Sequence, residues 1–378
     1  MKKILFLSGT RADYGKLKAL IRAIDDADDF EAYIYVSGMH LVEKYGSTYR
    51  EILKDNYKNV YVAYGLYQTS SMSYNIGNLI CNFSGYVNNI KPDMIIVHGD
   101  RIDAMAGAMV GALNNVMVAH IEGGELSGTI DESIRHSISK LAHIHMVCND
   151  EAKERLIQMG EEEKRIFVLG SPDIDLMFSK QLPILETVKA KYEIPFDHYG
   201  ILMYHPVTTE YEKLSYNIGQ VVDAVLTSGR NYIVIFPNND FGSELIINEY
   251  KRFLLPKNKS HIRMFPSIRF EYFLSLLRNA DFMIGNSSAG VRETCVYGIP
   301  TIDIGTRQSG RYSLENIGNI QHTEEDKNCI LSAIDKIDQY RQMSCNFGDG
   351  KSTEKFLQIL RSNIWDFPIQ KRFIDIDF

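Results

Sequence analysis

Short apolar runs alternate with small-residue helical patterns between residues 94 and 141, and this alternation most constrains the fold. The run MIIVHG, residues 94–99, precedes Asp100, and the run VMVAHIE, residues 116–122, ends at Glu122. Short β-branched runs that end in glycine or an acid, with helices between them, are typical of parallel strands in an α/β sheet. The sequence therefore predicts a parallel α/β sheet in this half of the chain.

Three carboxylates follow these runs at successive turns. They are Asp100, Glu122 and Asp131, and Asp131 precedes a helical pattern that reaches Leu141. A lone Asp at such a place is more often a helix N-cap than a catalyst. However, ligands of open α/β sheets bind outside the carboxyl ends of the strands, and Gly123–Gly124 lets the backbone approach a ligand closely. We therefore expect the three acids to meet at one cleft.

The length of 378 residues indicates two domains, each large enough for its own core. We expect an N-terminal Rossmann-like domain over residues 1–170, which carries the three acids. A proline-rich linker should follow over residues 171–198. A second strand–helix series predicts a C-terminal Rossmann-like domain over residues 199–352. Residues 353–378 begin as an amphipathic helix and should pack back across a domain surface.

Composition excludes several classes of partner. The formal net charge is −7 and the sequence pI about 5.8, so no basic footprint for nucleic acid is present. The first apolar run is too short for a signal peptide, and no run approaches the roughly 20 apolar residues of a membrane span. The five cysteines are scattered and lack C-x-x-C spacing, which favours reduced thiols over a disulfide framework or a zinc site. We expect a cytoplasmic protein without a membrane partner.

The first strand runs into a glycine-containing turn, residues 9–16, where a phosphate could rest on helix N–H groups. The spacing from Gly9 to Gly15 is one residue too long for a P-loop, and Leu17 stands where Ser or Thr would bind magnesium. No G-x-G-x-x-G is present, so no dinucleotide cofactor is expected. Arg11 is either a bidentate phosphate ligand or an exposed surface residue.

The second half offers a further set of polar residues at strand ends. In GNSSAGVRE, residues 285–293, Ser287 and Ser288 precede a helix, where hydroxyl and N–H donors suit a diphosphate. Glu293 either accepts from ribose hydroxyls or stabilises the helix dipole. His205 and Asn238 follow two other strands of this half. A nucleotide-sugar site between two doubly wound domains fits these residues.

Taken together, the motifs resemble the hydrolysing UDP-N-acetylglucosamine 2-epimerases of bacterial sialic-acid and capsule synthesis. The motifs are GTRADYGKL (9–17), HGDRIDAMA (98–106), HIEGGELSGTIDESIRH (120–136), GNSSAGVRE (285–293) and GTRQSGR (305–311). Non-hydrolysing relatives have GTRPE, HVEAG and Pro-Glu-Glu where this chain has GTRAD, HIEGG and Ile130–Asp131–Glu132. The chain also resembles the epimerase half of the mammalian bifunctional enzyme, from which it departs at Gly15, where that enzyme has Ser. The resemblance implies two doubly wound Rossmann-like domains that face a cleft, the glycosyltransferase-B type.

The resemblance also implies roles for particular residues. Asp100, Glu122 and Asp131 would perform the chemistry. The residues that would hold UDP are Arg11, Arg101, His205, Asn238, Ser287, Ser288, Glu293 and Arg307. No cofactor and no metal are required, although magnesium could screen the diphosphate. The family resemblance suggests a homodimer.

The implied reaction converts UDP-N-acetylglucosamine and water to N-acetylmannosamine and UDP. One carboxylate removes the C2 proton as UDP departs, which gives a glycal, and a second acid returns a proton to C2 while water adds at C1. Three alternatives stay open. These are a hydrolysing epimerase for a related sugar such as UDP-N,N'-diacetylbacillosamine, a glycosyltransferase of the same fold, and a non-catalytic nucleotide-sugar sensor.

Overall fold

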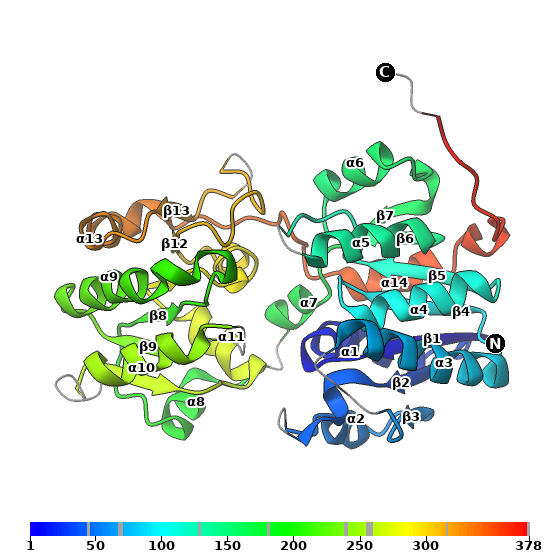
Figure 1. Cartoon of the computed structure of the whole chain (residues 1–378), viewed down its shortest axis with the longest axis horizontal. Helices are drawn as coiled ribbons and strands as arrows, with labels where there is room; N and C mark the ends of the chain where they lie inside the picture. Colours follow the sequence, from blue (N-terminus) through cyan, green and yellow to red (C-terminus); the bar gives the residue numbers. More distant parts are fainter. Residues whose placement is uncertain are drawn as a thin grey trace. The chain divides into compact units, whose positions relative to one another are not determined.

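The computed structural model describes residues 1–43, 46–66, 71–127, 130–179, 182–237, 241–254, 260–314 and 317–375. The chain divides into two compact units (Figure 1). Unit 1 is built from two separate stretches, residues 1–178 and 347–378, and unit 2 is the continuous stretch 179–346.

Unit 1 contains, among its described residues, a seven-stranded parallel sheet in the order β3-β2-β1-β4-β5-β6-β7. The strands are β1 (Lys2–Ser8), β2 (Phe30–Val36), β3 (Val60–Val62), β4 (Met94–His98), β5 (Met117–Ile121), β6 (Ile144–Val147) and β7 (Ile166–Val168). The helices are α1 (Arg11–Asp25), α2 (Tyr49–Lys54), α3 (Met72–Ile90), α4 (Ile102–Leu113), α5 (Ile130–Leu141), α6 (Asp150–Gln158), α7 (Asp173–Phe178) and α14 (Ser352–Leu360).

Both faces of this sheet are covered, which explains why its strands are apolar at consecutive positions. On one face, Ile4 and Phe6 of β1 pack with the side chains of α1 and α14. On the other face, Leu5 and Leu7 pack with those of α3 and α4. The strand order reverses direction between β1 and β4, and in such sheets the ligand site lies at that switch point.

Unit 2 contains, within its described ranges, a six-stranded parallel sheet in the order β10-β9-β8-β11-β12-β13. The strands are β8 (Gly200–Met203), β9 (Tyr232–Ile235), β10 (Ile262–Phe265), β11 (Phe282–Gly285), β12 (Thr301–Ile304) and β13 (Ile320–Thr323). The helices are α8 (Leu185–Lys191), α9 (Leu214–Thr227), α10 (Ser243–Leu254), α11 (Phe270–Arg278), α12 (Glu293–Tyr297) and α13 (Lys327–Asp335). Here the strand order reverses between β8 and β11.

The expected fold class, two doubly wound parallel α/β domains, is confirmed in each unit. The stretch 171–198, expected as a linker, instead contains two helices, α7 in unit 1 and α8 in unit 2. Unit 2 also ends in a strand and a helix, β13 and α13, that were not anticipated.

Residues 347–375 return to unit 1 and are held there by specific contacts. Phe356 and Leu360 of α14 are fully buried in the core beside α1. Beyond α14, the guanidinium of the buried Arg165 donates to the carbonyl oxygen of Pro368 at 3.0 Å and lies over the ring of Phe367. Lys371, three residues after Pro368, contacts the end of α5.

Two further expectations concern membranes and thiols. Over the described residues, no helix is both long enough and apolar enough to cross a membrane. All five cysteines are free thiols, and Cys148 and Cys295 are buried.

Candidate active site

Glu122 directly follows β5 and is the most enclosed of the three predicted acids. It is 5 % exposed and has a left-handed backbone with φ of 62°, which turns the chain sharply at the end of the strand. Lys16 of α1 donates to its two oxygens at 2.8 and 3.0 Å, and the hydroxyl of Ser171 donates to Oε1 at 2.6 Å. His98 Nε2 lies 3.4 Å from Oε2. The carboxylate is therefore fixed in position and balanced by an ammonium group.

Asp100 follows β4, the strand beside β5, and has a different cation. The guanidinium of Arg135 in α5 donates to its Oδ2 and also to the carbonyl oxygen of Glu125 at 3.0 Å. Arg135 is 6 % exposed, so this ion pair is shielded from water on the Arg135 side. The pair connects the end of β4 to helix α5.

Asp131 lies in the first turn of α5, inside the helix, whereas the sequence placed it before the helix. It precedes Arg135 by one helical turn, so the two side chains lie on the same face of α5. Through Arg135, the face that carries Asp131 is tied to Asp100. The structure thus brings Asp100 and Glu122 to adjacent strand ends, and attaches the helix of Asp131 to the first of them.

In the turn after β1, the N–H groups of Gly9 and Thr10 already have a partner within the chain. The carboxylate of Asp13 accepts from the N–H groups of Gly9 and Thr10 at 3.0 Å, while Thr10 Oγ1 accepts from the N–H of Asp13 at 3.3 Å. This capping box fixes the start of α1. Arg11, the first residue of α1, is exposed, and its Nε lies 3.4 Å from Glu51.

A second buried acid packs against the turn that follows β1. Asp103 of α4 is 8 % exposed and accepts from the hydroxyl of Ser37 at 3.0 Å. Burial, with a smaller effect from the charge of Asp13, raises the pKa of Asp103 to about 6. A Cβ atom on Gly9 would lie 2.3 Å from Asp103 Cγ, so only glycine permits this close packing. Arg101, which precedes α4, is exposed and contacts Met39 Sδ at 3.5 Å.

His120, the fourth residue of β5, has a structural role. It is fully buried, with Nε2 2.7 Å from the carbonyl oxygen of Gly99 and Nδ1 3.1 Å from the hydroxyl of Ser139. Burial lowers the pKa of His120 to about 3, so the imidazole is neutral. In that state Nε2–H donates to Gly99, and Nδ1 accepts from Ser139. His120 therefore links the turn that precedes Asp100 to helix α5.

Among the described residues, Glu122, Glu125 and Cys148 form a group whose ligating atoms all lie within 4.8 Å of one another. Carboxylate and thiolate groups are possible metal ligands. A cation there would compete with the ammonium of Lys16, which already contacts both oxygens of Glu122.

Asn286 organises the candidate site of unit 2, at the switch point of its sheet. It is fully buried, its Oδ1 accepts from the N–H of His205 at 2.6 Å, and its Nδ2 donates to the carbonyl oxygen of His205 at 2.9 Å. Its own carbonyl oxygen accepts from Arg307 at 3.0 Å and from Gln308 at 2.8 Å. The ends of β8 and β11 approach so closely that a Cβ on Gly285 would lie 2.0 Å from the carbonyl oxygen of Met203.

The remaining candidates of unit 2 lie on the short turns that follow β11. Ser287 caps a 3₁₀ turn, Ser288–Gly290, and its hydroxyl accepts from the N–H of Ala289 at 3.3 Å. Glu293 begins α12, a helix of five residues, so a helix does follow the serines, after the 3₁₀ turn. Asn238 lies outside the described residues.

The structure adds residues that the sequence did not single out. Lys16, Ser171 and Arg135 hold the two strand-end acids, and Asn286 joins His205 to Arg307. Lys16 and Arg135 lie inside the motifs GTRADYGKL and HIEGGELSGTIDESIRH, so the sequence could have pointed to both residues. Ser171 lies outside every motif, and only the fold reveals its contact.

Comparisons with known proteins show the family of the chain. The family model described as UDP-N-acetylglucosamine 2-epimerase matches residues 22–361. The chain is 48 % identical, over 383 aligned residues and the whole of both chains, to the UDP-N-acetylglucosamine 2-epimerase of Neisseria meningitidis serogroup B (strain ATCC BAA-335 / MC58). It is 32 % identical to the UDP-N,N'-diacetylbacillosamine 2-epimerase (hydrolyzing) of Legionella pneumophila, with 96 % of each chain covered.

Solved structures show the same fold at lower identity. The UDP-GlcNAc 2-epimerase from Neisseria meningitidis bound to UDP-GlcNAc superposes with a TM-score of 0.78 at 17 % identity, covering 95 % of this chain and 99 % of that one. The Methanocaldococcus jannaschii UDP-GlcNAc 2-epimerase in complex with UDP-GlcNAc and UDP gives 0.77 at 23 % identity, with the same coverage. From the match over residues 22–361 and the full-length relatives, the chain belongs to the UDP-N-acetylglucosamine 2-epimerase family.

Proposed function

We propose that this protein is a hydrolysing 2-epimerase that converts UDP-N-acetylglucosamine and water to N-acetylmannosamine and UDP. Asp100, Glu122 and Asp131 perform the chemistry on the sugar. The residues assigned to UDP are Arg11, Arg101, His205, Asn238, Ser287, Ser288, Glu293 and Arg307. From the resemblance to the sialic-acid enzymes, we assign this reaction to the first step of sialic-acid synthesis, in the cytoplasm.

One observation carries the proposal: two carboxylates follow adjacent strands, and each has its own cation. Asp100 pairs with Arg135, and Glu122 pairs with Lys16. A reaction that removes a proton from one face of C2 and returns one to the other needs at least two separately held acid–base groups. The motif differences HIEGG and Ile130–Asp131–Glu132 favour the hydrolysing branch, as do the relatives named as hydrolysing.

The chemistry balances in two steps. In the first, a carboxylate takes the C2 proton while the C1–O bond breaks, so UDP leaves with the bonding electrons and a glycal remains. Arginine and N–H donors stabilise the charge on the departing diphosphate. In the second, an acid returns a proton to the opposite face of C2, and water adds its hydroxyl to C1 and gives up a proton. The sum is one water consumed, with no oxidant or cofactor.

The test is the reaction in D₂O with UDP-N-acetylglucosamine as sole substrate, followed by NMR. The released N-acetylmannosamine should carry deuterium at C2, because that bond is broken and remade with a proton that exchanges with solvent. Mannosamine product that retains hydrogen at C2 contradicts the elimination mechanism. Simple hydrolysis gives N-acetylglucosamine, a glycosyltransferase without an acceptor releases little sugar, and a non-catalytic sensor releases none, so each rival has its own outcome.

UDP-N,N'-diacetylbacillosamine is the second candidate substrate, since relatives 32 % identical to this chain are named for it. The ratio of kcat/KM for the two UDP-sugars decides between them. We expect UDP-N-acetylglucosamine to be preferred, in line with the relative of 48 % identity. A preference for the bacillosamine sugar would change the substrate while leaving the mechanism intact.

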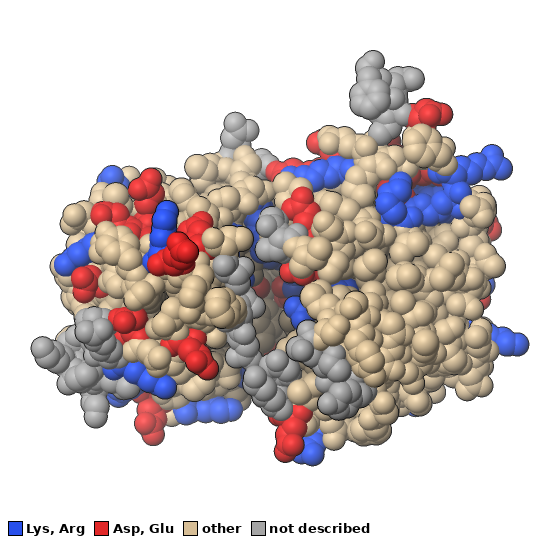
Figure 2. Space-filling model, viewed as in Figure 1, with Lys and Arg blue, Asp and Glu red and all other residues tan. Residues whose placement is uncertain are grey.

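We also propose that the protein is a homodimer that pairs through α3 and α4. Residues 72–90 of α3 contain no Asp, Glu, Lys or Arg, and the only such residue of α4 is the buried Asp103. Leu113 is nonetheless 76 % exposed and Tyr74 54 % exposed. Figure 2 shows a broad area without charged residues over these two helices. An uncharged face is best matched by an uncharged face, and the same surface of a second copy supplies one.

The glycines of α3 support the same face. A Cβ on Gly77 or Gly85 would meet nothing within 4 Å, so nothing among the described contacts of this chain requires glycine there. Each mid-helix glycine costs about 1 kcal/mol relative to alanine, which a closely packed partner helix would explain. Light scattering should give twice the mass of the 43.2 kDa chain. Leu113→Asp should give the monomer, and a monomeric wild type would overturn the assignment.

A further inference from the structure

We propose that Lys371 is a positioning residue, which holds the C-terminal end of α5 so that Asp131 and Arg135 stand correctly at the other end. This inference rests on the proposed function, because it assigns Lys371 a part in the reaction through Asp131. Lys371 belongs to the stretch that returns to unit 1 after α14, more than two hundred residues after α5.

Lys371 Nζ contacts three carbonyl oxygens at the end of α5. The distances are 3.2 Å to Ser139, 3.0 Å to Lys140 and 2.7 Å to Ala142. The last carbonyl groups of a helix have no partner within the helix, and a cation there also interacts favourably with the helix dipole. A compact ammonium with several donors suits three converging carbonyls. The side chain therefore closes α5 at the end opposite to Asp131.

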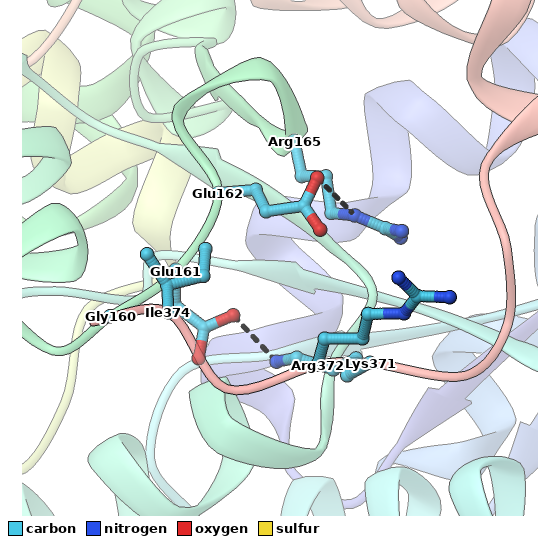
Figure 3. Close-up of a pocket in the computed structure, with 7 residues that line it drawn as sticks. All are labelled: Gly160, Glu161, Glu162, Arg165, Lys371, Arg372 and Ile374. Carbon is cyan, nitrogen blue, oxygen red and sulfur yellow. Dashed lines mark hydrogen bonds and ion pairs between the residues drawn. The ribbon is translucent and has the colours of Figure 1, made fainter.

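The ammonium is itself fixed by a buried carboxylate. Glu161 is 3 % exposed, and its Oε2 lies 2.5 Å from Lys371 Nζ (Figure 3). The same oxygen lies 3.0 Å from Nε2 of the fully buried His145. Burial opposes the charge of Glu161, yet His145, Lys140 and Lys371 together lower the pKa of Glu161 to about 2. Glu161 therefore keeps its charge, while burial lowers the pKa of the Lys371 ammonium and the charge of Glu161 opposes that effect.

The backbone around this pair is shaped to admit the returning segment. Gly160 has a φ of 78° at the end of α6, and a Cβ there would lie 3.4 Å from the carbonyl oxygen of Ile374. On the other side, Arg165 donates to the carbonyl oxygen of Pro368 at 3.0 Å. The segment is thus bound by Arg165 before Lys371 and lies against Gly160 after it.

The consequence at the other end of α5 follows from the rigidity of a short helix. Asp131 and Arg135 occupy its first two turns, and Arg135 pairs with Asp100. A shift of α5 by a fraction of a turn moves Asp131 and strains the pair with Asp100. Small displacements of catalytic groups, on the order of 1 Å, can lower rates about 10²-fold.

The experiment is a double-mutant cycle on the full chain. We compare kcat and KM for UDP-N-acetylglucosamine in wild type, Lys371→Met, Asp131→Asn and the double variant, with hydrogen exchange measured on α5. Lys371→Met should lower kcat about 10- to 100-fold, leave KM within about two-fold, and speed exchange in α5. Arg372→Met, at the exposed neighbouring position, serves as the matched control and should behave as wild type.

The cycle separates positioning from a general loss of stability. In the Asp131→Asn background, Lys371→Met should lower kcat little further, because the group it positions is already lost. An equal loss in both backgrounds, or a wild-type kcat in Lys371→Met, overturns the proposal. If Lys371→Met does not fold, Lys371→Gln takes its place with the same criteria, because its shorter, neutral side chain has only two donor hydrogens for the three carbonyls. Full activity in Asp131→Asn would instead contradict the proposed function, while the exchange data still test the contact with α5.

Discussion

At the scale of single residues, the notable feature is that charges in unit 1 are balanced in pairs at the strand ends. Glu122 with Lys16 and Asp100 with Arg135 are each held by hydrogen bonds as well as by charge. A buried carboxylate that loses such a partner pays a large desolvation cost, so removing either cation should disturb the acid beside it. The pairs explain how several acids can share one small region.

The first prediction concerns the acids themselves. Asp100→Asn, Glu122→Gln and Asp131→Asn should each keep the fold and lose at least about 10² in kcat, the usual contribution of a general acid or base. Steady-state kinetics with circular dichroism as the folding control checks this. A variant that retains near wild-type turnover shows that its acid serves only the structure.

A second prediction concerns the assigned UDP residues. Ser287→Ala or Arg307→Ala should weaken UDP binding by about 1.5–3 kcal/mol, the value of a hydrogen bond to a charged group. Thr306→Ala, at the exposed position beside Arg307, is the control and should bind UDP as wild type does. Calorimetry measures the affinity, and unchanged binding in both test variants removes these side chains from the UDP site.

At the scale of elements, two glycines at the start of α1 allow a direct comparison, because one is tightly packed and the other has open space around its Cα. A Cβ on Gly9 would lie 2.3 Å from Asp103 Cγ, whereas a Cβ on Gly15 in α1 meets nothing within 4 Å. Gly9→Ala should therefore destabilise by about 1–3 kcal/mol through overpacking. Gly15→Ala should stabilise by about 0.5–1 kcal/mol, because alanine favours the helix. Denaturant midpoints measure both changes in stability. An unchanged midpoint in Gly9→Ala would mean that the turn shifts to accommodate the added methyl group.

The long apolar strands and periodic helices were predictable from sequence, because burial on both faces leaves unbroken β-branched runs. The strand β3, of three residues, and the turns after β11 were not, since such short segments carry too few residues for a periodic pattern. Contacts such as Ser171 with Glu122 depend on the finished fold, which brings together residues from distant parts of the chain. The positions of Asp100 and Glu122 were predictable because each follows an apolar strand.

At the scale of the whole molecule, buried neutral histidines make stability depend on pH. Burial lowers the pKa of His120 to about 3 and that of His143 to about 4, whereas an unfolded histidine titrates near 6.5. Below pH 6.5 the unfolded chain binds protons that the folded chain excludes. The stabilisation is therefore complete above pH 6.5 and is lost as the pH falls towards 4, by about 1.4 kcal/mol per unit for each group.

Thermal midpoints at pH 7.5, 6.5 and 5.5 test this, and they should fall between the last two. His143 Nδ1 accepts from the N–H of Val118 at 3.0 Å. In His143→Asn the amide oxygen can accept in its place and does not titrate, so the fall in midpoint should be smaller. An equal fall in this variant would assign the pH dependence to other groups.

The divided construction of unit 1 has a consequence for synthesis on the ribosome. The apolar surface that α14 covers emerges with residues 1–178, but Phe356 and Leu360 arrive only after the 168 residues of unit 2, numbers 179–346. At about 5–20 residues per second, that surface waits roughly 10–30 s. Unit 2 is continuous and can finish folding first, so the usual N-terminal-first order is reversed. During that interval the nascent chain presents an uncovered apolar face to chaperones.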